Sequence, residues 1–319
     1  MELYPFQLSY VIKSPIWGGT RLKREWGRAS ETATIGESWE LTVRREEKSR
    51  ITNGVYAGRT LESVIAEAGR NLIAPDFAGR EFPLLVKLID AGDRLSVQVH
   101  PDDAYAARVE NDRGKTEMWY IVEADEGAEI VCGLREGATG ADFASAVADG
   151  DPERVLRHCR VRPGECYFIP AGLPHAIGKG ILIAEIQQNC DLTYRVYDYN
   201  RRQPDGSLRP LHIQKALDVV RPFTAEEISA LRYARRSDTL ANGEILADCQ
   251  YFRVERLRLR GNCRLPACAS MRHVLCLGGE AALLCGGQTY RLRRGDSWFL
   301  PPMPEVRLEG ELLALVSGV

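Results

Sequence analysis

The stretch "RPGECYFIPAGLPHAI", residues 162–177, has a counterpart further along the chain, "RRGDSWFLPPMPEVRL", residues 293–308. A glycine, an acidic residue, an aromatic residue, an apolar residue and a proline recur in the same order, at a constant offset of 131 positions. The second stretch has Val306 where the first has His175. A repeat of this kind predicts two copies of one β-fold, of which only the first is equipped for chemistry.

Short runs of strand-forming residues surround the first stretch, and glycine, proline and aspartate separate them. The alternation of these runs predicts strands at 82–89, 94–100, 117–123, 128–133, 158–162, 165–170, 181–188 and 193–199. Strand-like patterning returns from residue 244 onward. The chain is therefore expected to be mainly β, built as two β-sandwich or barrel units with a small helical portion.

Helices are expected in three places. Apolar residues recur at helical spacing in 60–73, in 141–159, which interrupts the strands as an insertion, and in 212–233, where Pro222 divides two helices. The segment 35–60 is polar and turn-rich, and we expect it to be irregular.

These patterns divide the chain into three parts. Residues 1–205 are expected to form an N-terminal metal-binding unit with helical insertions. Residues 206–240 form a helical connector, and 241–319 form a second unit that has lost the chemistry of the first.

The composition excludes several classes of function. The 42 basic and 44 acidic side chains give a net charge of -2, so the chain has no excess of positive charge with which to bind nucleic acid or an anionic membrane. The start lacks a secretory pattern, and no apolar run reaches the roughly 18 residues that a membrane span needs. The nine cysteines are scattered without a C-x-x-C pair, which fits buried thiols in a reducing compartment. We therefore expect a cytoplasmic protein.

Polar residues that could bind a metal stand out in strand-like surroundings. Gln98 and His100 share one face of the run 94–100, with Cα atoms roughly 7 Å apart, so both can reach a single ion. Glu117 lies in the next strand pattern, and His175 follows a tight turn rich in proline and glycine. Two imidazoles, a carboxylate and an amide oxygen suit Zn²⁺, with iron, manganese or cobalt as substitutes. Taken singly, each histidine is more often a core or surface residue than a ligand, so the prediction rests on their joint pattern.

The joint pattern resembles the signatures of the cupin superfamily, whose members fold as jelly-roll β-units. The first signature, G-x5-H-x-H with a later Glu, is matched from Gly92, except that Gln98 replaces the first histidine. The second, G-x5-P-x-G-x2-H, is matched without a gap from Gly164 to His175. A longer spacing than usual separates His100 from the glutamate.

Both departures are those of the type I mannose-6-phosphate isomerases, which the sequence closely resembles, in particular the short bacterial form. The resemblance is carried by "SPIWGGTRL" (14–22), "IGESWEL" (35–41), "LSVQVHPDD" (95–103), "GKTEMWY" (114–120), "PAGLPHAI" (170–177) and "TYRVYDYNR" (193–201). It implies zinc ligands at Gln98, His100, Glu117 and His175, with one Zn²⁺ per chain. It also implies an active-site arginine at Arg195.

The same resemblance suggests further roles. Lys115 matches the family lysine at the substrate, and Trp17, with the following Gly18 and Gly19, matches a stretch near the pocket; burial beside a tight turn would explain this tryptophan equally well. The proton carrier stays open among Lys115, Glu185 and metal-bound water.

The implied activity is the interconversion of mannose 6-phosphate and fructose 6-phosphate through an enediolate, by a monomer or a homodimer. Donors to the 6-phosphate could come from Lys13, Ser14 or Arg202. Two other functions stay open at this point: another metal-dependent cupin enzyme, either a dioxygenase or a sugar-phosphate isomerase of different specificity, and a non-catalytic sugar-binding cupin.

Overall fold

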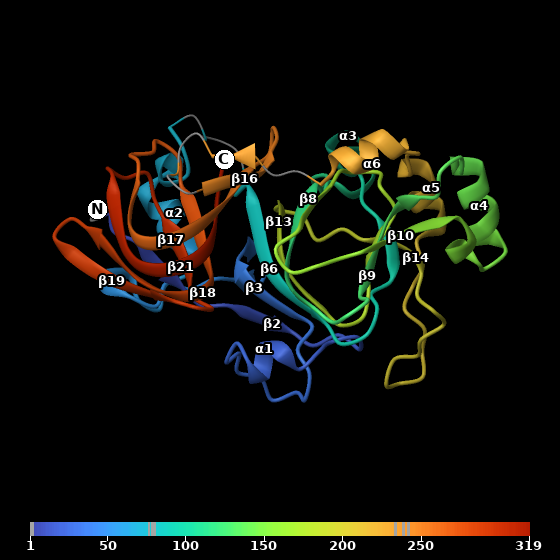
Figure 1. Ribbon diagram of the computed structural model, residues 1–319, viewed down its shortest axis with the longest axis horizontal. Coiled ribbons are helices and arrows are strands. Elements are labelled where there is room, and N and C mark those ends of the chain that lie inside the picture. The colour runs from blue at the N-terminus through green and yellow to red at the C-terminus, as the bar shows by residue number, and fades with distance from the viewer. Residues whose placement is uncertain (1–2, 76, 78–80, 233–234, 238–239, 241–242) are drawn as a thin grey trace.

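The computed structural model describes residues 3–75, 77, 81–232, 235–237, 240 and 243–319. It confirms a mainly β chain, with two β-rich units side by side and helices at their margins (Figure 1). Within these residues, no helix has the length and apolar character that crossing a membrane requires.

The N-terminal unit consists of two antiparallel sheets. The six-stranded sheet has the order β11-β8-β13-β6-β3-β2, and the five-stranded sheet has the order β10-β9-β12-β7-β14. The strands of the first sheet are β2 (Val11–Lys13), β3 (Glu37–Leu41), β6 (Leu84–Ala91), β8 (Glu117–Ala124), β11 (Cys166–Ile169) and β13 (Ile181–Gln188). Those of the second are β7 (Val97–Val99), β9 (Glu129–Leu134), β10 (Leu156–Arg160), β12 (His175–Ile177) and β14 (Tyr194–Tyr197).

The C-terminal unit is one eight-stranded antiparallel sheet. Its strands are β15 (Arg235–Arg236), β16 (Gly243–Asp248), β17 (Arg253–Leu265), β18 (Arg272–Cys285), β19 (Gln288–Arg293), β20 (Ser297–Leu300) and β21 (Val306–Gly318), together with β1 (Phe6–Leu8). Since β1 pairs with β20, the N-terminal end of the chain lies on this unit (Figure 1). This pairing crosses the division into 1–205, 206–240 and 241–319, which otherwise stays a prediction.

Short helices and two further strands complete the chain. The α-helices are α1 (Arg21–Arg24), α2 (Leu61–Ala68), α3 (Asp103–Glu110), α4 (Gly140–Ala148), α5 (Ile213–Val219) and α6 (Ala225–Ala230). The 3-10 helices are η1 (Gly54–Tyr56), η2 (Arg70–Leu72) and η3 (Pro152–Val155), and β4 (Val43–Arg44) pairs with β5 (Glu47–Lys48).

The predicted helices and strands are largely confirmed, with three corrections. The helix expected at 60–73 ends at Ala68, because Gly69 adopts a φ of 82°. The helix expected at 141–159 also ends early, and its last residues form β10 against β9. The supposedly irregular segment 35–60 contains β3, whose charged and apolar residues are almost all buried between neighbouring strands.

Alternation along the central strands sorts their side chains between two environments. On β6, β8 and β13, one set of alternate residues packs toward the C-terminal unit, with Leu88, Tyr120 and Ala184 as examples. The other set points between the two N-terminal sheets, where Trp119 and Ile183 contribute to an apolar cluster. Because both faces are covered, these strands are buried along most of their length, and polar residues on the inner face are enclosed.

The sequence repeat is visible as two equivalent turns. Gly164 and Gly295 precede β11 and β20 with φ of 93° and 88°, a conformation that favours glycine. Each turn is held by an arginine from the other unit: Arg256 Nη1 donates to the Gly164 carbonyl at 2.8 Å, and Arg28 Nη2 donates to the Gly295 carbonyl at 2.7 Å. The two units therefore exchange matching contacts across their interface.

Candidate metal centre and active site

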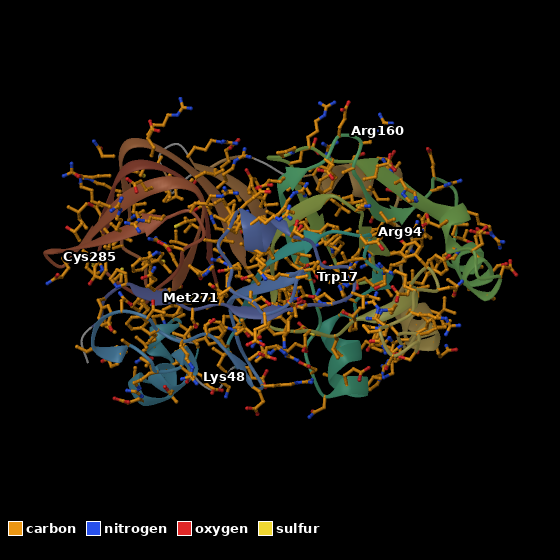
Figure 2. The ribbon with its side chains drawn as sticks, turned by 90° about the horizontal axis from the view of Figure 1, so that it is seen from below. Trp17, Lys48, Arg94, Arg160, Met271 and Cys285 are labelled. Atoms are coloured by element: carbon orange, nitrogen blue, oxygen red, sulfur yellow. The ribbon has the colours of Figure 1, made fainter. Side chains whose placement is uncertain are left out.

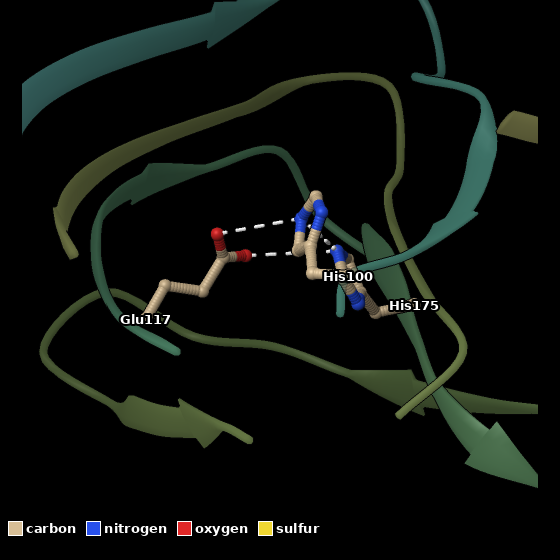
Figure 3. A group of neighbouring side chains, drawn as sticks. All are labelled: His100, Glu117 and His175. Carbon is tan, nitrogen blue, oxygen red and sulfur yellow. Dashed lines mark hydrogen bonds and ion pairs between the residues drawn. The ribbon is translucent and has the colours of Figure 1, made fainter. Parts of the chain in front are cut away.

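Four predicted metal ligands come together between the two N-terminal sheets. Gln98 lies on β7, His100 directly follows that strand, Glu117 is the first residue of β8, and His175 is the first residue of β12. Gln98 and His175 are direct cross-strand neighbours, so their side chains share the inner face. Figure 3 shows the carboxylate of Glu117 directed toward both imidazoles.

The ligand atoms of the histidines and the glutamate lie within 4.8 Å of one another. The two Nε2 atoms of His100 and His175 are 3.1 Å apart, and each is 3.5 or 3.6 Å from a Glu117 oxygen. The Nδ1 of His175 is 2.8 Å from the Leu173 carbonyl, which accepts its hydrogen and leaves the Nε2 lone pair facing the cluster. This arrangement presents three convergent electron pairs.

Burial sets the protonation of the cluster. All three side chains are at most 1% exposed. Burial, reinforced by the nearby Lys115 ammonium, lowers the pKa of His175 to about 3 and lowers that of His100. Burial also raises the pKa of Glu117 to about 7. Neutral imidazoles are the form that binds a metal.

The residues present fit a divalent cation. Glu117 Oε1 is buried without a hydrogen-bond partner among the described residues, a cost that a bound cation would remove. Lys115 already places its ammonium against Glu117 Oε2 and 3.0 Å from His100 Nε2, so the cluster attracts positive charge. Gln98 Nε2 lies 3.3 Å from His175 Nε2, and rotation of the amide about its last bond would present an oxygen there instead.

Four cross-strand neighbours form a row of side chains across the six-stranded sheet, beside the predicted metal ligands. Glu185 on β13 is the direct cross-strand neighbour of Trp119 on β8 and of Lys87 on β6, and Lys87 is the neighbour of Trp39 on β3. The indole of Trp119 donates to Glu185 Oε2 at 3.0 Å, and its ring packs edge-on against the His175 ring. This tryptophan therefore contacts both the predicted metal ligand and Glu185.

Two lysines keep Glu185 ionised. Lys87 Nζ lies 3.2 Å and Lys115 Nζ 4.0 Å from Glu185 Oε1. Burial alone would raise the pKa of Glu185, but the two ammonium groups bring it below its ordinary value. The site thus holds one enclosed carboxylate beside the metal ligands that is charged at neutral pH.

Arg195 lies in the same row as the ligands. It is the direct neighbour of Gln98 on β14, and its side chain donates from Nε to Ser96 Oγ at 3.3 Å and from Nη1 to the Pro210 carbonyl at 2.8 Å. Its neighbour Asp198 binds two arginines, Arg201 and Arg209, which fixes the start and end of the loop that carries Pro210.

Other predicted site residues are not brought to the cluster. Ser14 bonds to the Thr32 hydroxyl, Lys13 pairs with Glu47, and Arg202 donates to the Gly206 carbonyl on an exposed hairpin.

Trp17 is buried in the apolar cluster that also includes Trp119. This burial agrees with a core role for Trp17, and its contact with substrate stays a prediction. The backbone after it is closely packed, because a Cβ on Gly19 would lie 2.2 Å from the Asp90 carboxylate.

Two residues of the site were missed from the sequence. Lys87 interrupts the apolar run "FPLLVKLI", and a lysine at an inward position of a buried strand requires a carboxylate partner, which was an available signal. Ser96 alternates with Gln98, but nothing in the sequence indicates that its hydroxyl meets Arg195.

The two-unit β-fold and this enclosed centre define the chain as a cupin protein with a candidate metal site. Comparison with known families gives the same class and narrows it: residues 5–136 match the model of the phosphomannose isomerase type I catalytic domain, and residues 243–319 match that of the mannose-6-phosphate isomerase cupin domain.

Relatives extend this match to the whole chain. It is 37% identical over 319 residues to mannose-6-phosphate isomerase ManA of Bacillus subtilis, covering 99% of each chain. It is also 37% identical to mannose-6-phosphate isomerase of Streptococcus mutans, covering 98% of each. The chain therefore belongs to the type I phosphomannose isomerase family and is an isomerase.

Solved structures agree with this assignment. The crystal structure of the mannose 6-phosphate isomerase from Bacillus subtilis has 33% identity and a TM-score of 0.88, with 99% of each chain covered. A variant of phosphomannose isomerase from Salmonella typhimurium has 19% identity and a TM-score of 0.80, with 98% of this chain and 99% of that chain covered, and shares the fold.

Proposed function

We propose that the chain interconverts mannose 6-phosphate and fructose 6-phosphate with one divalent cation held by Gln98, His100, Glu117 and His175. The observation that carries this proposal is the convergence of three buried ligand atoms within 4.8 Å, in a chain of this family. Zn²⁺ suits two imidazoles, a carboxylate and an amide oxygen. When bound, such an ion would stabilise negative charge on the substrate oxygens as a Lewis acid.

The proton transfer between C1 and C2 is assigned to Glu185. Its carboxylate is enclosed, stays ionised beside Lys87 and Lys115, and is fixed by the indole of Trp119. These contacts hold the two carboxylate oxygens of Glu185 next to the metal ligands, where they can accept a proton. Lys115, in contact with Glu117 and His100, is suited to stabilise developing negative charge and to orient the substrate, rather than to carry the proton.

Arg195 is assigned to the enediolate or the phosphate. Its guanidinium lies on the row of Gln98 and is held by Ser96 and Pro210. With Arg201 and Arg209 it gives three cations near Asp198, and Arg201 also pairs with Asp93, so three cations face two carboxylates and this side of the site has an excess of positive charge. That excess favours the loop between Asp198 and Pro210 over Lys13, Ser14 and Arg202 as the binding site of the 6-phosphate.

The cellular setting follows from the same proposal. A sugar phosphate substrate favours the cytoplasm. The centre draws all its residues from one chain, so it is complete in either a monomer or a homodimer.

A coupled assay tests the proposed function. Chelator should abolish turnover of mannose 6-phosphate, and Zn²⁺ should restore it. Glucose 6-phosphate serves as the substrate control, and oxygen uptake tests the dioxygenase alternative. Sugar binding without chelator-sensitive turnover would instead support a non-catalytic cupin and overturn the proposal.

A further inference from the structure

A cavity of about 900 Å³ lies between the two units and is lined by none of the proposed metal ligands. One wall comes from α3 and the residues around it, including Asp103 and Ala107. The opposite wall comes from the ends of β16, β17, β18 and β21, near the C-terminal end of the chain in Figure 1. A volume of this size at an interface between units is typical of small-molecule sites.

The floor of the cavity is apolar. Phe252 and Met271 line it and are almost fully buried, and Met271 is fixed because its N–H donates to the Ile73 carbonyl at 2.6 Å. Figure 2 shows Met271 at the edge of the C-terminal strands. Tyr251 adds a partly exposed ring. Such a floor would cover the apolar body of a ligand.

Most charged groups around the cavity are already paired. Arg253 forms ion pairs with Asp248 and Glu255, and Arg113 forms one with Glu81. These pairs leave little charge for a ligand.

Arg272 is different. Its Nη1 donates to the Pro266 carbonyl at 2.7 Å, and it forms no ion pair with any residue that the structure describes. In the sheet, Gly318 is the cross-strand neighbour of both Arg272 and Arg253, so β21 places no side chain between the two arginines. Its neighbour Ser317 pairs with His273 and points to the other face of the sheet.

We propose that this cavity binds a small organic anion with an apolar body, whose phosphate or carboxylate group is held by Arg272 beside Gly318. The guanidinium of Arg272 has no ion-pair partner among the described residues and matches the oxygens of such a group, and the bare backbone at Gly318 allows it to approach. The accessible apolar surface of Tyr251 and Ala107 in the lining selects for an apolar body over a free inorganic anion.

A ligand bound there would touch the back of the active site. Asp103 Oδ1 accepts from the Gly114 N–H and Gln188 Oε1 accepts from the Thr116 N–H, both at 2.8 Å, and both side chains line the cavity. They hold the segment that carries Lys115.

The test uses phenyl phosphate, which has an apolar ring and cannot be isomerised, titrated calorimetrically into the zinc-loaded full chain. Binding should survive Arg195→Ala, which removes the active-site cation, and should weaken at least about tenfold in Arg272→Gln. Inorganic phosphate should bind more weakly than phenyl phosphate. Ala107→Phe, on the exposed side of α3, should block binding by filling the cavity, and it provides a second variant if Arg272→Gln fails to fold.

Two results would overturn the proposal. The first is affinity lost in Arg195→Ala but unchanged in Arg272→Gln, which would place the phosphate in the active site. The second is no binding of phenyl phosphate at about 5 mM to the zinc-loaded enzyme.

Discussion

The two units share a turn and differ in the strand that begins after it. In both, a glycine with positive φ leads into a short strand, β11 or β20, and a second strand begins after the next turn. That second strand starts with His175 in one unit and with Val306 in the other. The backbone of this fold therefore tolerates either a metal ligand or an apolar residue at the same place, and chemistry depends on side chains at a few inward positions.

The interiors show the same contrast. Between the N-terminal sheets, Glu117 and Glu185 occupy inward positions of adjacent strands, and the ammonium groups of Lys87 and Lys115 balance their charge. In the C-terminal unit, Val306 packs with Leu283 and other apolar residues in a continuous core. An enclosed charged group is tolerated only where its partners are enclosed with it, so the site had to be acquired or lost as a set.

Giving the N-terminal unit the residue of its counterpart should have the largest effect. His175→Val removes a ligand, so we expect loss of bound metal and a fall in kcat of at least about 10⁴-fold. Metal analysis and the coupled isomerase assay measure both. The reverse change, Val306→His, should bind no second ion, because the described residues that share its core cluster are apolar. A variant His175→Val that keeps its metal and rate would refute the comparison.

The reciprocal arginine contacts should differ in strength. Arg28→Ala leaves Glu40, which is 1% exposed, buried without its cation, and we expect it to lower the free energy of unfolding by about 3–5 kcal/mol. Arg256→Ala should cost about 1 kcal/mol, because its partner Glu244 is partly exposed. Denaturant titration measures both values. Equal losses would contradict the difference in burial.

Removing the guanidinium of Arg195 should reduce turnover and leave metal binding intact. We expect Arg195→Ala to keep its metal and lose about 10²–10³-fold in kcat, because charge stabilisation at the substrate is lost. Arg202→Ala, on the exposed hairpin, is the matched control and should leave kcat unchanged. An unchanged rate in Arg195→Ala would remove this residue from the mechanism.

The C-terminal unit has its own buried histidine, and it should make folding sensitive to acid. Burial lowers the pKa of His273 to about 3. Between pH 6.5 and 3 this residue is therefore protonated in the unfolded chain and neutral in the folded chain. Stability contributed by this residue is complete above pH 6.5 and falls with pH, by about 2 kcal/mol at pH 5. Urea unfolding at pH 7 and pH 5, with chelator present, should show a smaller pH effect in His273→Gln.

The smallest effect is expected at Trp119. Trp119→Phe keeps an aromatic ring beside His175 but removes the donor to Glu185, so kcat should fall about tenfold while metal is retained. In the background of Glu185→Gln the same change should have no further effect. The control is Trp298→Phe in the C-terminal unit, whose indole N–H has no partner among the described residues. Additive losses would mean that Trp119 does not act through Glu185.

The sequence predicted much of this fold because its strands are short runs of strand-forming residues separated by glycine, proline and aspartate. Gln98 and His175 could be identified because polar residues at inward positions of apolar strands need partners, and the repeat gave the two units. Strand β3 was missed because its charged residues are satisfied by distant partners: Arg28 pairs with Glu40, and Lys87 lies 3.7 Å from Glu37.

The remaining gaps concern contacts that no local pattern encodes. The position of the Arg195 side chain depends on a carbonyl fifteen residues away and on the hydroxyl of Ser96, which precedes β7. The pairing of β1 with β20 joins opposite ends of the chain. Such contacts follow from the assembled tertiary structure and not from periodicity.

The exchanged arginine contacts and the crossing of β1 affect what a protease could do to this chain. A cut within the exposed stretch 204–208 would break the backbone between the units. It would leave Arg28 on the Gly295 carbonyl, Arg256 on the Gly164 carbonyl and β1 against β20. The nicked halves would stay together through gel filtration and come apart only in denaturant.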